Sequence, residues 1–454
     1  MVANPGEGAN FLIRSYAQET FRRATLVRGT CLGLAILLVL LTPSQSDAYA
    51  VLAHQAEIDV VWESHLKPLL HRKFPKATED VLDGAEAYAY GGAIIQDLGY
   101  YPYGSRFFSN LAHYVRSGDF VTALLRDSED VDEYAFALGA LSHYASDIDG
   151  HRVAVNPSVP KLYPKLQKKY GDRVTYEDDP LAHVQTEFGF DVLQVARGRY
   201  ASDEFHDFIG FEVSQRLLDR VFLETYGLPL SSVLLDEEKA LNSYRRDVSK
   251  LIPKATRVAW SLKSKEIQAE EPSATHRKFL YNLSRADFEK QWGKNYRKPT
   301  ASERFLAFLY KLLPKFGPLR VLQLRVPTPD TEKLFEASFN ASLDRYRTLL
   351  VEEGEGRLQL RNTNFDVGAD TPPGQYRLND DTHAELLNKL AQNGFKGATP
   401  ELQSELLQFF DHPEAPYATK KDAKAWAQVQ TELQQLRGVH VPLMASPGSP
   451  SHLK

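Results

Sequence analysis

The chain contains a single cysteine, Cys31, among its 454 residues. Because Cys31 lies in an apolar N-terminal stretch, the rest of the chain has neither a disulfide framework nor a thiolate metal site. Any metal ion must therefore be held by nitrogen and oxygen atoms. The chain also lacks an excess of positive charge: its net charge is −5, so there is no global positive field to hold a long nucleic-acid duplex.

The sequence has no apolar run that is long enough to be a confident membrane span. The longest candidate, Cys31–Leu41, is short, follows three arginines at positions 22–28 and precedes a polar stretch that ends in small residues. This pattern predicts that residues 1–48 form a signal peptide, with an uncleaved anchor or a buried helix as the alternative. Cleavage is expected after Ala48 or Ala50, and the small-residue rule does not choose between them. The expected location is secreted or periplasmic.

The rest of the chain has the composition of a folded protein, with 43% hydrophobic and 25% charged residues. Its length predicts two or three domains. Apolar residues recur at helical spacing, and strand signals are nearly absent before 356–378, so we expect a mainly α, multi-helix bundle with an additional C-terminal helical region. The expected helices are 52–72, 79–97, 105–126, 129–151, 180–197, 203–226, 235–263, 276–313, 330–352, 380–392 and 400–437.

Domain boundaries are predicted where glycine, proline and polar residues gather. Glu270–Ser273 indicates one boundary, and Arg361–Gln375 indicates a linker or an ordered long loop. We therefore divide the chain after the leader into 49–265, a helical region 271–355 of unknown role, a loop with C-terminal helices at 356–444, and a disordered tail at 445–454. Phe305–Val326 is apolar with interspersed lysines and arginines; it fits an interfacial membrane segment, or a buried helix–turn–strand with its lysines in solvent.

Two stretches carry residues that bind metals at helical spacing. His143, Asp147 and His151 follow one another at intervals of four, and because four residues turn a helix by about 400°, the three side chains share one face. His183 and Glu187 repeat this spacing on another expected helix. Two such helices can hold metal ions in the core of a bundle, although single pairs of this kind are also common on solvated helix faces.

Further candidate ligands precede these helices. Asp97 follows an apolar run, where an unpaired buried charge would be costly, and His113 and His54 lie on expected helices. Taken alone, His113 fits a hydrogen-bonded core histidine and Asp97 fits a cap of the turn before Gly99. Five other histidines have no carboxylate pattern and are assigned to the surface or to structural roles: His65, His71, His206, His276 and His383.

The order of these residues resembles the zinc-dependent phospholipase C family, which is similar in turn to single-strand-specific zinc nucleases. The resemblance covers roughly residues 49–230. It implies an α-helical protein with about three zinc ions, in which the first mature residue binds metal through its own amino group and carbonyl. Carried over, the first zinc ligands are Asp97, His113, His143 and Asp147, and the second set is His151, His183 and Glu187. Asp147 would bridge to a third zinc shared with His54 and the N-terminal residue.

The implied N-terminal ligand favours cleavage after Ala48, which makes Tyr49 the first residue, five positions before His54. This chain departs from the family pattern in having tyrosine where tryptophan is usual. It also has a shorter gap from Asp147 to His151 and a longer gap from His151 to His183.

The resemblance implies phosphodiester hydrolysis, with zinc ions that lower the pKa of bound water and Asp97 positioning or deprotonating that water. We expect an exported phospholipase C acting on a phospholipid or membrane surface. The alternatives are a single-strand nuclease or nucleotidase and an inactive metal-stabilised binding protein. No protein partner is indicated. Asp149 could orient a ligand histidine, but a solvated carboxylate is the favoured interpretation. Four tyrosines could stack bases or pack in the core: Tyr100, Tyr101, Tyr103 and Tyr144.

Overall fold

The computed structural model describes residues 51–197, 199–200, 209–270 and 317–440. The predicted leader, Tyr49, the helix expected at 276–313, the tail and most of Phe305–Val326 lie outside the described residues. Among the described helices, none combines the length and the apolar character that a membrane crossing requires.

The described residues are mainly helical, which confirms the predicted fold class, and they contain no β-strand. The strand-like signals at 356–378 correspond to a loop with one isolated bridge between Asn364 and Ala369. The elements, with 3-10 and π segments labelled η, are α2 (Val51–Val61), η1 (Trp62–Leu66), α3 (Lys67–Lys73), α4 (Glu79–Gly92), η2 (Ile95–Tyr100), α5 (Arg106–Tyr114), α6 (Ser117–Arg126), α7 (Val131–Asp149), η3 (Gly150–Val155), α8 (Asn156–Leu162), α9 (Pro164–Tyr170), α10 (Pro180–Ala196), α12 (Gln215–Tyr226), η4 (Leu230–Ser232), α13 (Glu237–Arg246), η5 (Asp247–Leu251), α14 (Ile252–Glu270), η6 (Gly317–Gln323), α17 (Pro329–Gly354), α18 (Arg377–Gln392), α19 (Pro400–Phe409), η7 (Ala418–Lys421) and α20 (Ala423–Gly438).

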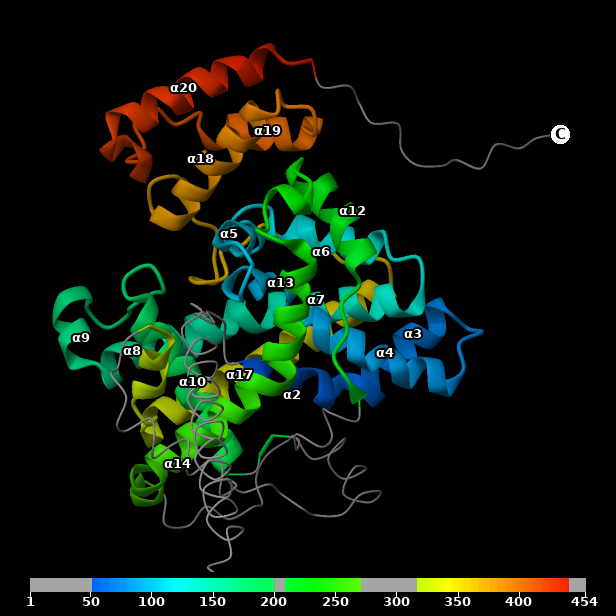
Figure 1. Cartoon of the computed structure of the whole chain (residues 1–454), viewed down its shortest axis with the longest axis vertical. Coiled ribbons are helices and arrows are strands. Elements are labelled where there is room, and N and C mark those ends of the chain that lie inside the picture. The colour runs from blue at the N-terminus through cyan, green and yellow to red at the C-terminus, as the bar shows by residue number, and fades with distance from the viewer. Residues whose placement is uncertain (1–50, 198, 201–208, 271–316, 441–454) are drawn as a thin grey trace, which may run out of the picture.

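Helix α7 is the central element of the bundle (Figure 1). It packs against α2, α4, α6 and α17, and every residue from Glu133 to its end is buried. Helices α4 and α7 approach so closely that a Cβ atom on Gly139 would lie 2.1 Å from the carbonyl oxygen of Ala89, and one on Gly92 would lie 1.9 Å from that of Phe136. Only glycine permits this crossing, which fixes α7 against the helix that precedes Asp97.

Three expected helices are interrupted, each for a local reason. The helix expected at 105–126 breaks at Arg116, whose φ of 53° lies in the left-handed region. The helix expected at 400–437 breaks between α19 and η7, where Pro413 and Pro416 cannot continue a helical ladder. The helix expected at 203–226 is broken at 210–214, before α12 begins at Gln215, and in this break Glu212 donates its N–H to the carbonyl oxygen of Ala87 on α4 at 2.9 Å.

The C-terminal helices form one end of the molecule. Figure 1 shows α18, α19 and α20 grouped beyond α5 and α6, and α18 packs on α5. A continuous apolar cluster of buried residues runs from Val51 in α2 to Leu436 in α20. The division into domains stays a prediction, but the apolar core crosses the boundaries that it proposes.

Candidate metal centre

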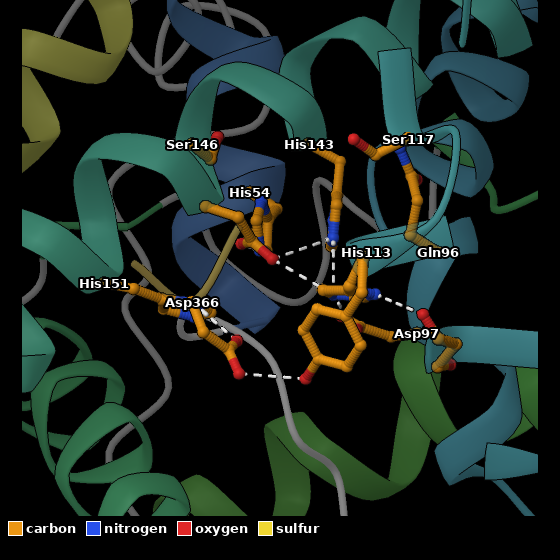
Figure 2. Close-up of polar contacts among 12 residues, drawn as sticks. His54, Gln96, Asp97, His113, Ser117, His143, Ser146, His151 and Asp366 are labelled. Carbon is orange, nitrogen blue, oxygen red and sulfur yellow. Dashed lines mark hydrogen bonds and ion pairs between the residues drawn. The ribbon is translucent and has the colours of Figure 1, made fainter. Parts of the chain in front are cut away.

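The helices bring eight of the nine predicted ligands to one buried region; the ninth, Tyr49, lies outside the described residues. Figure 2 shows His54, His113 and His143, from three different helices, pointing toward one another. Each of the three lies 3.1–3.4 Å from a carboxylate oxygen of Asp147. All eight side chains belong to residues that are at most 3% exposed. They are His54 on α2, Asp97 on η2, His113 on α5, His143 and Asp147 on α7, His151 on η3, and His183 and Glu187 on α10.

The potential ligand atoms fall into three groups, within each of which they lie no more than 4.8 Å apart. Two groups share His143 and the third is separate from them. The groups are His54, His143 and Asp147; Asp97, His113 and His143; and His151, His183 and Glu187. The set implied for the second zinc, His151, His183 and Glu187, thus forms one group. Of the four residues implied for the first zinc, Asp97, His113 and His143 form another group.

Asp147 lies between the first two groups. Its Oδ2 faces His113 Nε2 at 3.2 Å and His143 Nε2 at 3.1 Å, whereas its Oδ1 faces His54 Nε2 at 3.4 Å. One carboxylate thus turns each oxygen toward a different set of nitrogens. That is the geometry needed to bridge two cations.

The distances between ligand atoms fit zinc. Four-coordinate zinc binds nitrogen and oxygen at about 2.0–2.2 Å, so neighbouring ligand atoms around a tetrahedral ion lie about 3.3 Å apart. His113 Nε2 is 3.4 Å from Asp97 Oδ1 and 3.5 Å from His143 Nε2. In the third group, His151 Nε2 and His183 Nε2 lie 3.3 and 2.9 Å from Glu187 Oε1.

The buried carboxylates of the centre have few protein donors. Within the described part of the chain, the carboxylate oxygens of Asp97, Asp147 and Glu187 face only the ligand histidines and accept no other hydrogen bond. Buried polar atoms are normally satisfied, and an unsatisfied carboxylate is costly. Cations between these side chains would supply the missing partners, so the donor set fits a cluster of zinc ions without any thiolate.

Main-chain carbonyls orient two of the histidines. His113 Nδ1 lies 2.7 Å from the carbonyl oxygen of Ser109, and His143 Nδ1 lies 3.0 Å from that of Ala93. Because a carbonyl oxygen only accepts, Nδ1 carries the proton in each ring and the lone pair of Nε2 points into the centre. Gln96 fixes the Ala93 turn further, since its amide donates to the carbonyl of Ala140 in α7 at 2.9 Å.

His151 lies beyond the end of α7, in the π-helical segment η3. Pro157 and Pro160 follow closely, and because proline cannot donate to the carbonyl four residues earlier, the α-helical ladder does not continue unchanged. The wider turn places His151 against α10, where His183 and Glu187 share a face. The predicted single helix face thus holds for His143 and Asp147, whereas His151 faces a separate group.

The site shifts the pKa values of its own groups. Burial and the neighbouring His143 lower the pKa of His54 to about 4, so its imidazole is neutral at neutral pH. Burial opposes protonation of His113 as well, but contacts with Asp147 and Asp97 raise its pKa to about 10. Burial raises the pKa of Asp97 to about 6, against the opposing effect of His143. Zinc must therefore displace a proton at His113 but not at His54, which makes zinc binding dependent on pH.

The structure adds two contacts that the sequence pattern did not indicate, both from the loop between α17 and α18. Asp366 Oδ1 lies 3.3 Å from His151 Nδ1. The ring of Phe365 packs on those of His113 and His143, with centroids 5.2 and 6.1 Å apart. The predicted linker at Arg361–Gln375 is thus an ordered loop that covers the centre, and no local spacing in the sequence could have revealed these contacts.

The structure corrects the interpretation of Asp149 and places three of the five remaining histidines. Asp149 is not solvated: it is buried, and it accepts hydrogen bonds from Arg345 at 2.7 Å and Arg152 at 2.8 Å, which leaves it no role beside the ligand histidines. His383 is structural, since its ring stacks on Phe409 at 3.6 Å between centroids. His65 is half-buried and His71 exposed, and both lie outside the three groups; His206 and His276 lie outside the described residues.

Comparison with known proteins agrees with this geometry. Residues 59–235 match the sequence model of the family described as zinc dependent phospholipase C. The matched segment contains every placed ligand except His54. Neither the curated proteins nor the solved structures gave a match to the chain. The resemblance carried by the ligand pattern is confirmed by this match of residues 59–235 to the zinc-dependent phospholipase C family.

Proposed function

We propose that this protein is an exported zinc-dependent phosphodiester hydrolase of the phospholipase C type, which cleaves a phospholipid headgroup. The observation that carries the proposal is the arrangement of the ligand atoms in three adjoining groups whose spacing fits tetrahedral zinc. Zinc ions bound there would polarise a phosphoryl oxygen and bring the pKa of bound water to about 7. A phosphodiester is the substrate class that such a cluster serves best.

Asp97 is the proposed proton acceptor. Its Oδ1 faces His113 at 3.4 Å, which leaves Oδ2 for the proton of an attacking water. Since burial raises the pKa of this carboxyl to about 6, it is a stronger base than an ordinary aspartate and yet is still ionised at neutral pH. Asp147, flanked by His143 and His151, keeps a pKa well below the usual range despite its burial, so it stays anionic and serves only as a ligand.

The surroundings of the centre favour a lipid over a single-stranded nucleic acid. Three of the four tyrosines proposed to stack bases are buried in the core: Tyr100, Tyr101 and Tyr144 are 5%, 4% and 5% exposed. Tyr103 is 49% exposed, and Lys239 lies over its ring. A base-stacking platform beside the metals would need exposed rings.

The direct test compares substrates on the mature, zinc-replete protein. Hydrolysis of phosphatidylcholine should exceed hydrolysis of single-stranded DNA, and a chelator should abolish it. Equal or faster cleavage of DNA would contradict a phospholipase C and support a single-strand nuclease.

The burial of all eight ligand residues favours a second candidate, a protein whose zinc ions stabilise the fold without catalysis. Inorganic phosphate is the probe that separates the two, because an open coordination position should bind it and a closed structural site should not. Full zinc content with neither phosphate binding nor turnover on lipid or DNA would establish the structural role.

The N-terminal ligand remains part of the proposal. Support comes from the start of α2, where the N–H of Leu52 donates to Asp191 Oδ2 at 3.0 Å on α10, one turn beyond Glu187. This contact holds the beginning of the helix beside the centre. Zinc content and hydrolysis should be higher for protein beginning at Tyr49 than for protein with one extra glycine before it; equal values would remove Tyr49 from the ligand set.

A further inference from the structure

The histidine of the third group has contacts at both ring nitrogens. His151 Nε2 faces Glu187 Oε1 at 3.3 Å, and on the opposite side of the ring Nδ1 faces Asp366 Oδ1 at the same distance. Figure 2 shows the Asp366 carboxylate beside His151. Asp366 lies far outside the segment that matches the family, in the loop between α17 and α18.

Asp366 is fixed at several points. Its Oδ2 accepts hydrogen bonds from the hydroxyl of Tyr114 at 2.9 Å and from that of Tyr376. Its own N–H donates to Asn364 Oδ1 at 3.0 Å, and its carbonyl accepts from Asn156 Nδ2 at 2.6 Å. Because these contacts use Oδ2 and the main chain, Oδ1 is held toward the imidazole.

A carboxylate in this position has a specific effect on the ring. At 3.3 Å its negative charge favours the tautomer with the proton on Nδ1, which leaves the lone pair on Nε2, the nitrogen that faces the group formed with His183 and Glu187. This group has one anionic ligand, Glu187, so a second carboxylate behind the histidine adds negative charge without occupying a coordination position.

We infer that Asp366 is a positioning residue for the metal group formed by His151, His183 and Glu187. It orients His151 and strengthens zinc binding in this group. The loop between α17 and α18 is therefore part of the metal site. The inference rests on the proposed zinc cluster. It assigns a role to a region that the family match does not cover. The alternative is that Asp366 only anchors the loop, through its hydrogen bonds with Tyr114 and Tyr376.

The test uses the full mature chain and measures zinc directly. Asp366→Asn keeps the shape and one acceptor oxygen but removes the charge, whereas Asp370→Asn changes a carboxylate of the same loop that is 53% exposed and paired with Arg361. We measure zinc per chain, zinc affinity by chelator competition, and the absorption spectrum after cobalt substitution. Loss of an outer carboxylate typically weakens metal binding about 10–100-fold.

Asp366→Asn should lose one zinc ion per chain at a chelator concentration that wild-type protein and Asp370→Asn withstand, and its cobalt spectrum should change. Wild-type affinity and an unchanged spectrum in Asp366→Asn would overturn the inference alone, since wild-type zinc content would still support the cluster. A wild-type protein without zinc would overturn both.

A second variant keeps the test decisive if Asp366→Asn does not fold. Tyr114→Phe with Tyr376→Phe leaves the carboxylate in place and removes the two hydroxyls that fix it. The inference predicts weaker binding of one zinc ion, by a smaller factor than in Asp366→Asn. Undiminished affinity of all zinc ions in this double variant would overturn the positioning role.

Discussion

The two ends of the metal centre orient their histidines in different ways. At the end that contains His143 and His113 the orienting acceptors are main-chain carbonyls, that of Ala93 in the turn after α4 for His143 and that of Ser109 in α5 for His113. Around His151 the acceptor is the side chain of Asp366, on a loop that joins two distant helices. The first arrangement follows from packing α4 against α7 and α5 against η2, whereas the second depends on one side chain of a loop, whose contact a single substitution can remove.

This difference separates what the helix bundle supplies from what the C-terminal region adds. Changes at the first end should disturb folding and metal binding together, because the close crossing of α4 and α7 stabilises the bundle and also positions His143. Changes at the second end should reduce metal binding while the bundle remains. The following variants test that distinction, from the largest expected effect to the smallest.

Replacement of His143 should have the largest effect, because this residue belongs to two of the three groups. His143→Ala should lose more than one zinc ion per chain and more than about 100-fold in hydrolysis, since loss of an outer partner alone costs about 10–100-fold. Elemental analysis and a phosphatidylcholine assay provide the measurement. The matched control is His71→Ala, at an exposed position on α3. Zinc content equal to that of the control would show that His143 is not a ligand shared by two zinc ions.

Replacement of His183 and Glu187 should remove a single ion. Both residues belong to the third group, and their side chains lie 2.9 Å apart. Residues that act as a unit are non-additive, so the double variant should lose about as much zinc and activity as either single variant. A double variant whose loss equals the product of the two single losses would argue for independent roles.

Replacement of Gly139 should affect the first end through packing. The Cβ of Gly139→Ala would lie 2.1 Å from the Ala89 carbonyl, so α4 and α7 must separate, at about 1–3 kcal/mol of unfolding free energy. Chemical denaturation measures this loss. Gly84→Ala on α4 is the control, because its Cβ meets nothing within 4 Å and should stabilise the helix by up to about 1 kcal/mol. Equal stability of the two variants would contradict the close crossing.

Replacement of Glu57 should give the smallest effect, and one that depends on pH. Burial raises the pKa of Glu57 to about 8 from 4.5, although Ser146 and Ser142 donate to it. The folded state therefore holds a proton that the unfolded state loses above pH 4.5, and stability should fall as the pH rises from about 4.5 to about 8. Glu57→Gln should flatten this fall, so that its stability relative to wild-type protein is greater near pH 8 than near pH 4.5.

Thermal melting across this pH range provides the measurement for Glu57. Glu63→Gln is the control, since that side chain is 61% exposed. A pH dependence that is identical in wild-type protein and Glu57→Gln would show that Glu57 does not hold the proton.

The residues that sequence reasoning found are those whose relation is local. A spacing of four on one helix is visible in the chain, and it placed His143 with Asp147 and His183 with Glu187, as the structure does. Helical periodicity likewise predicted the fold class. The break at Arg116 was not predicted because the residues after it contact a distant loop: Ser117 donates its hydroxyl to the carbonyl of Thr363, and Asp119 donates its N–H to Asn362 Oδ1.

The contacts that sequence reasoning missed are those between distant segments. Asp366 reaches His151 only because the loop is fixed by Tyr114 on α5 and by Asn156 on α8. Asp149 was interpreted as solvated because nothing nearby in the sequence reveals Arg345, which reaches it from α17. Such partners follow from the packing of α17 on α7 rather than from any periodicity.

The most direct test of the central claim is the zinc content of the mature protein, purified without chelators and measured by elemental analysis. The three groups of ligands predict about three zinc ions per chain, and removing them should lower the melting temperature because the buried carboxylates then lose their partners. A protein that retains less than about one zinc ion per chain, and melts at the same temperature with and without a chelator, would contradict the account.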